Sequence, residues 1–206
     1  MRQPFTAAIA ALVLSLLVAC VPQDGAPSHP NPIIIREFAF APAAVTLDRS
    51  FGFSLYRGEP GVPPSQRAAG LGRAVAFNLA DAMAEQLTSQ GYDVIRSDTA
   101  ALEPGARAIV VSGSFRYINE GSRRRVGAEN SSVAIDAQID YQGSPTAAPQ
   151  RLAAFQLDSR QVASGGYIGV SASNADVKAA SARLGSAIAG YVGDTARLNK
   201  WPSARR

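Results

Sequence analysis

The sequence predicts an α+β domain with a single mixed, largely antiparallel sheet of about four to five strands and two helices packed on one face. Two segments predict the helices, since residues 65–90 and 177–198 carry apolar side chains at helical spacing. Alternation of apolar and polar side chains from residue 109 to 161 predicts the antiparallel strands. The domain is expected to cover residues 33–202, with a basic tail at 203–206.

The first strand is expected at residues 33–40, which are β-branched and aromatic and end before Pro42. Short extended pieces are expected at residues 44–48 and 51–56, and a short strand at 92–95. The long strand at 109–118 should bury one face, made of Ile109, Val111, Phe115 and Tyr117. The strand after it alternates more cleanly, with an inward face of Val133, Ile135, Ala137, Ile139 and Tyr141. Residues 151–161 complete a meander, with Phe155 and Leu157 pointing inward.

Both helices have a recognisable apolar stripe. In the first, apolar residues recur every four positions and Gly91 is the expected stop; the stripe is Leu71, Val75, Leu79, Met83 and Leu87. The second is expected to start with a cap at residues 173–176 and to end before Pro202. Its stripe is Val177, Ala180, Leu184, Ile188, Tyr191, Thr195 and Leu198. This helix should cover the same sheet face as the first.

The N-terminus has the pattern of an export signal. Arg2 precedes an aliphatic run of about a dozen residues, which is too short to span a membrane. The run ends in Leu17-Val18-Ala19-Cys20, which resembles the bacterial lipobox. That resemblance implies cleavage of residues 1–19 and acylation of Cys20, followed by a proline-rich, disordered tether to residue 32. Three acyl chains would hold the protein on the membrane for long times. The alternative is an ordinary secretory signal with an incidental cysteine.

Composition and charge limit the partners. The chain has 206 residues, 47% hydrophobic and 17% charged, which is ordinary for a folded domain. Its net charge of +4 is concentrated at residues 123–125 and in the C-terminal tail. Because an exported protein does not meet nucleic acid, an anionic polymer or another protein of the cell envelope is the expected partner. A solvated basic loop and tail is the alternative.

The predicted domain lacks the residues that most catalytic mechanisms need. The only histidine, His29, lies in the tether, and Cys20 is the only cysteine. Without them the domain has no base for a nucleophilic triad and no histidine or cysteine ligand for a metal. Aspartates at 136, 140 and 158 are expected on the polar face of the sheet, where alternation alone explains them. Gly70 and Gly72 match half of a dinucleotide-binding fingerprint, although close packing explains them better. No enzyme activity, cofactor or metal is predicted.

The connection between the two best strands is the candidate binding loop. It is longer and more charged than a hairpin requires, and long loops on a rigid sheet often carry binding. Its candidate partner-binding residues are Glu120, Arg123, Arg124, Arg125 and Glu129. The alternative is that the loop folds back and its arginines pair with Glu120, Glu129 or the aspartates of the sheet.

Residues 117–133 resemble the hallmark of a bacterial lipoprotein family, domain of unknown function 4410. The resemblance includes Glu120-Gly121, the arginines that follow it, Arg36-Glu37-Phe38, Gly91-Tyr92 and Val111-Ser112-Gly113. This chain departs from the glycine-rich return of the family at Gly127-Ala128-Glu129-Asn130. The resemblance implies a lipoprotein with an α/β domain and no established activity.

Together these observations predict a non-catalytic lipoprotein of the outer membrane that faces the periplasm and serves as an interaction or assembly module. The alternative is a carrier of a small or lipidic ligand, which would need an apolar cavity between the sheet and the helices.

Overall fold

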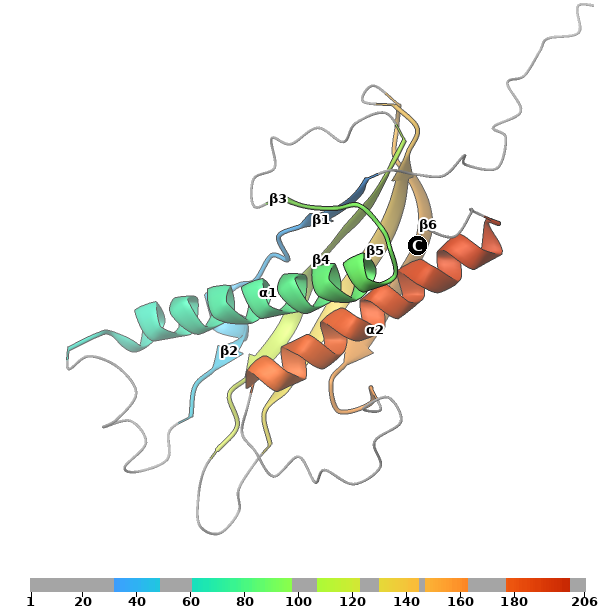
Figure 1. The fold of residues 1–206 in the computed structure, drawn as a ribbon. Coiled ribbons are helices and arrows are strands. Elements are labelled where there is room, and N and C mark those ends of the chain that lie inside the picture. The colour runs from blue at the N-terminus through green and yellow to red at the C-terminus, as the bar shows by residue number, and fades with distance from the viewer. Residues whose placement is uncertain are drawn as a thin grey trace, which may run out of the picture.

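The computed structural model describes residues 32–48, 61–97, 107–122, 130–144, 147–162 and 177–200. Two helices, α1 (Pro64–Ser89) and α2 (Val177–Leu198), lie side by side on one face of a mixed sheet (Figure 1). The predicted α+β class with two helices on one face is confirmed. Neither helix is long and apolar enough to cross a membrane. The expected signal, most of the tether, the extended piece at 51–56 and the helix start at 173–176 lie outside the described residues.

The sheet has six strands, and its order is β3-β1-β4-β5-β6 with β2 beside β4. Their bounds are β1 (Ile33–Arg36), β2 (Val45–Thr46), β3 (Val94–Ser97), β4 (Ala108–Asn119), β5 (Ser132–Gln142) and β6 (Gln150–Asp158). The pairs β4–β5 and β5–β6 are antiparallel and form the predicted meander. β1 is parallel to both β3 and β4, and β2 is parallel to β4. The sheet is therefore mixed because the N-terminal strand enters between two strands that come later in the chain.

Helix α1 follows its predicted stripe. Pro64 lies in the first turn, where a missing N–H breaks no helical hydrogen bond. The helix ends in a Schellman motif, in which Tyr92 N–H donates to Leu87 O at 3.1 Å and Gly91 N–H donates to Thr88 O at 2.8 Å. Gly91 has a φ of +87°, which other residues rarely adopt, so the predicted glycine stop is confirmed.

Helix α2 packs along α1 at close range. Gly185 faces α1, and a Cβ there would collide with the Leu79 carbonyl oxygen and lie 3.1 Å from Ala82 Cβ. The predicted α2 stripe is correct at Val177, Ala180, Leu184, Ile188 and Thr195 and wrong at Tyr191 and Leu198, which are 43% and 83% exposed. Ala189, Val192 and Ala196 are also buried, so the buried side of α2 is wider than a single stripe predicts.

The segment after β1 is folded between the sheet and α1. The sequence predicts strand through residue 40, but β1 ends at Arg36 and only an isolated bridge at Ala39 continues the pairing. Phe38 is buried at 1% exposure against Phe115, with the ring centroids 6.1 Å apart. Gly113 makes room for it, since a Cβ there would lie 2.5 Å from Phe38 Cε1. The strand is shorter than predicted because Phe38 turns into the core.

Gly72 has a similar packing role in α1. It is buried, and a Cβ there would collide with the ring of Phe40. This contact agrees with the close-packing interpretation for Gly72, whereas nothing lies within 4 Å of a Cβ built at Gly70.

Candidate functional site

A bulge in β4 decides which residues reach the sheet face that the helices leave open. Phe115 lies opposite Ile135, whereas Tyr117 lies opposite Ala134, so the register shifts at Arg116. Ile118 is therefore buried at 0% exposure in the core, and Tyr117 turns to the open face. The prediction that Tyr117 points inward is wrong, because simple alternation does not account for the extra residue.

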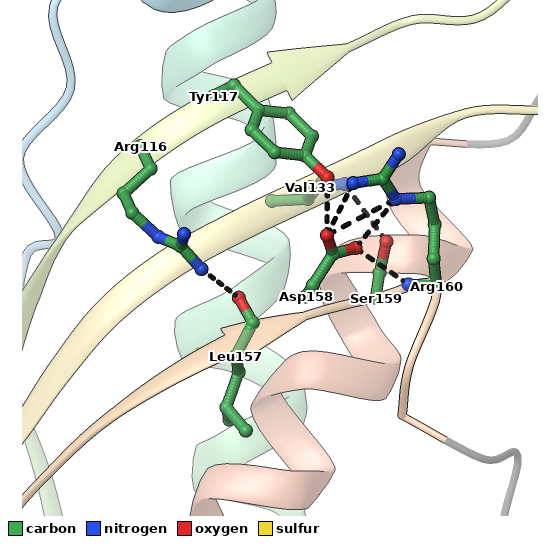
Figure 2. Close-up of polar contacts among 7 residues, drawn as sticks. All are labelled: Arg116, Tyr117, Val133, Leu157, Asp158, Ser159 and Arg160. Atoms are coloured by element: carbon green, nitrogen blue, oxygen red, sulfur yellow. Dashed lines mark hydrogen bonds and ion pairs between the residues drawn. The ribbon is translucent and has the colours of Figure 1, made fainter.

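Asp158, at the end of β6, is the centre of a polar cluster on this face (Figure 2). Its carboxylate accepts hydrogen bonds from the Tyr117 hydroxyl at 2.7 Å, from Arg160 Nη2 at 2.7 Å and from the Arg160 backbone N–H at 2.9 Å. The hydrogen bonds from Arg160 hold the pKa of Asp158 well below its usual range, although Asp158 is only 8% exposed. Burial, with help from the nearby carboxylate, raises the pKa of Tyr117. The cluster closes the turn after β6 onto β4.

Ser159 and Arg116 bind β6 to its neighbours from either side of Asp158 (Figure 2). Val133 N–H donates to Ser159 Oγ at 2.9 Å, and Ser159 N–H donates to Val133 O at 2.9 Å. Arg116 reaches across β5 and donates to the Leu157 carbonyl at 3.4 Å. These bonds fix the position of the open face relative to the core.

The centre of the open face has a shallow hollow of about 500 Å³. It is lined by residues of β4, β5 and β6, namely Ser112, Gly113, Ser114, Asp136, Ala137, Gln138, Ala154, Phe155 and Gln156. Gln138 Nε2 donates to Ser112 Oγ at 3.0 Å. Asp136 Oδ1 lies 3.2 Å from Arg116 Nε without the alignment of a hydrogen bond. Hydroxyl, amide, carboxylate and guanidinium groups at this hollow suit a polar partner.

The three aspartates predicted on the polar face are there, and each has an arginine partner. Arg116 pairs with Asp136, Arg151 with Asp140 at 3.2 Å, and Arg160 with Asp158. Each carboxylate is thus part of an ion pair across or along the strands. Within the described residues, no group of three His, Cys, Asp or Glu side chains could hold a metal ion.

Glu120, the first residue of the predicted binding loop, is buried at 4% exposure. Its Oε2 accepts a hydrogen bond from Asp48 N–H at 2.9 Å, and its carbonyl accepts one from Ser131 Oγ at 2.8 Å. Glu120 therefore joins the segment after β2 to both ends of the loop, and its carboxylate is turned away from solvent. The other predicted site residues, Cys20, Arg123, Arg124, Arg125 and Glu129, lie outside the described residues.

The cluster of Tyr117, Asp158 and Arg160 was not foreseen from the sequence. One local signal was present, since an aspartate at a strand end can accept a hydrogen bond from the backbone N–H two residues later and so stabilise a turn. No comparable signal pointed to Tyr117, because its partner is 41 residues away and meets it only through the bulge.

Asp158 should make the stability of the fold depend on pH. Because its pKa is lower in the folded chain than its ordinary value of about 3.9, its contribution is complete above that pH and is lost as the pH falls below it. We expect Asp158→Asn to lower the free energy of unfolding at pH 7 by about 2 kcal/mol, a modest value because Arg160 is largely exposed. Urea unfolding at pH 7 and pH 3 should show this difference shrinking in acid.

Asp194→Asn is the matched control, because Asp194 pairs with Arg197 on the exposed surface of α2. Its effect should be near zero at both pH values. A difference between wild type and Asp158→Asn that stays constant from pH 7 to pH 3 would contradict the role given to Asp158.

Comparison with known proteins does not assign a family. No family model matches this chain, and no curated protein matches it. A crystal structure of a Xanthomonas campestris protein of domain of unknown function 330 has a TM-score of 0.42 at 10% identity, over 84% of this chain and 91% of that chain. A Helicobacter pylori protein described as a neuraminyllactose-binding hemagglutinin homolog has a TM-score of 0.32 at 12% identity, over 65% of this chain and 64% of its own length. Membership of domain of unknown function 4410 is not confirmed.

Proposed function

We propose that this chain is a non-catalytic lipoprotein of the bacterial outer membrane, and that the open polar face of its sheet docks another component of the periplasm. The anchor is Cys20, on the strength of Leu17-Val18-Ala19-Cys20 after a short apolar run. Membership of domain of unknown function 4410 belongs to the same proposal and rests on the resemblance around Glu120-Gly121 and the arginines after it.

One observation carries the docking proposal. Both helices cover the same face of the sheet, and the central part of the opposite face of β4, β5 and β6 presents polar side chains around a hollow. Ser114 and Gln156 are exposed there, and Arg116 and Asp136 are partly exposed and held in an ion pair. Polar groups whose positions are fixed by a rigid sheet lose little conformational entropy on binding, which favours recognition of a polar protein or polymer surface.

The carrier alternative has less support. It needs space between the sheet and the helices, and the side chains of that layer include Ile109, Val111, Leu184 and Ile188, all at 0% exposure. The carrier alternative could instead place a small polar ligand in the hollow of the open face. Native mass spectrometry of the purified protein would detect such a ligand.

The docking proposal is tested by placing a bulky charge in the hollow. We expect Ser114→Arg to abolish recovery of the partner after crosslinking in intact cells and pull-down through the C-terminus, while the thermal midpoint changes little. The matched control is Ser186→Arg, because Ser186 is exposed on α2 in the other layer and should leave recovery unchanged. Equal recovery with both variants would refute docking at the open face.

The loop arginines are tested in the same assay. Replacing Arg123, Arg124 and Arg125 with alanine separates a contribution of the loop from that of the open face. Loss of recovery with the triple variant alone would place the docking surface on the loop instead of the sheet.

A further inference from the structure

Strand β6 forms one edge of the sheet, and among the described residues no strand pairs with its outer side. Residues 152–157, Leu-Ala-Ala-Phe-Gln-Leu, contain no charge and no proline. Soluble proteins usually protect an edge strand with charges, prolines or a covering segment, because its unpaired backbone groups are a template for another strand. An uncharged central run in β6 therefore suits pairing with a further strand.

The hydrogen bonds to β5 show which backbone groups of β6 point outward. Ser159 N–H donates to Val133 O, which gives this pair the backbone orientation of a hydrogen-bonded pair of the antiparallel ladder, with the return bond from Val133 N–H made to Ser159 Oγ. The register continues without a shift from Ala134–Asp158 to Ile139–Ala153. Because hydrogen-bonded and non-hydrogen-bonded pairs alternate, the N–H and C=O groups of Ala154 and Gln156 point away from β5, toward the free edge.

The side chains of β6 match a second copy of the same strand. On the helix side, Phe155 stacks on Tyr191 of α2 with the ring centroids 4.5 Å apart, and both rings remain partly exposed. If two β6 strands run antiparallel with Ala154 opposite Gln156 of the second copy, Phe155 lies opposite Phe155 across the two-fold axis. All outward backbone groups of Ala154 and Gln156 are then paired, and four aromatic rings gather on the helix side.

The charges at the two ends of β6 agree with this arrangement. Arg151 lies at the start of the strand and Asp158 at its end, so an antiparallel copy brings Arg151 of one chain beside Asp158 of the other. A parallel arrangement would place like charges together at each end.

We propose that this protein forms a two-fold symmetric dimer through antiparallel pairing of β6 with β6 of a second copy. The dimer has one continuous sheet with all four helices on the same face. The hollow of the open face then lies beside its counterpart, because Ala154 and Gln156 belong to both the hollow and the edge. Self-pairing uses the backbone groups of these two residues, so it does not require a partner on the open face.

The test uses the full-length chain in detergent, with its mass measured by sedimentation velocity over a range of concentrations. We expect the wild type to be dimeric and Ala154→Pro to weaken the dimer by roughly 30-fold or more, because proline removes an outward N–H from each chain. The β5–β6 ladder does not use that N–H, so at concentrations where both chains are monomeric the thermal midpoint should stay close to that of the wild type. Ala154→Ser keeps the N–H and is the matched control, which should remain dimeric.

A disulfide experiment tests the register without relying on proline. Ala154→Cys and Gln156→Cys, each in a Cys20→Ser chain, are mixed and oxidised, and the heterodisulfide between the two variants should exceed either homodisulfide. A monomeric wild type, a dimer unaffected by Ala154→Pro, or a dimer without the heterodisulfide would each overturn the proposal. A disulfide from the cysteine at position 154 to a different protein, in place of a second copy of this chain, would overturn it as well.

Discussion

Replacing Gly185 with alanine should lower the free energy of unfolding by about 3 kcal/mol. The reason is contact between the helices, since the new Cβ would collide with the Leu79 carbonyl oxygen and lie 3.1 Å from Met83 N. Backbone atoms of α1 cannot move aside as a flexible side chain can, so α1 and α2 must separate along their length. This loss exceeds the gain of about 1 kcal/mol that alanine has over glycine inside a helix. Urea unfolding measures the difference in the free energy of unfolding, provided that the dependence of that free energy on urea concentration has the same slope in both proteins.

Gly190→Ala is the control, because Gly190 lies in the same helix and nothing is within 4 Å of its Cβ position. It should stabilise the protein by about 0.5–1 kcal/mol, through helix propensity alone. If Gly185→Ala stabilised the protein as Gly190→Ala does, this result would contradict the close packing of α1 against α2 at Gly185.

Phe38→Ala should lower the free energy of unfolding by about 4 kcal/mol. Phe38 is 1% exposed and contacts Gly113 and Phe115, so its removal leaves a cavity in the core. The same change also removes the contact that draws the segment after β1 into the core. Chemical unfolding measures the loss of free energy, and no separate probe of the structure at residue 38 is needed.

Phe77→Ala is the matched control. Phe77 is 59% exposed on α1 and contacts the guanidinium of Arg96, 4.4 Å from the ring centroid. Its removal should cost less than about 1 kcal/mol. Similar losses for Phe38→Ala and Phe77→Ala would mean that residue 38 does not lie in the core.

The candidate site was only partly predictable. Alternation correctly placed Asp136, Asp140 and Asp158 on one polar face, because side-chain direction in a strand has a period of two. It failed at Tyr117, where one extra residue in β4 reverses the direction of every later side chain. It also gave no sign that Glu120 would be buried, since its partner Asp48 is 72 residues away.

Local pattern alone determined the elements: the period of α1 and its glycine stop, the alternation of β5, and the class of fold that two helices and a meander must form. The tertiary structure decided what depends on contacts between distant segments. These are the entry of β1 between β3 and β4, the inward turn of Phe38, the approach of the helices at Gly185 and the position of Tyr117. The physical reason is that helix and strand periods arise from the backbone geometry of neighbouring residues, whereas close packing and strand register arise from surfaces that meet only after the chain has folded.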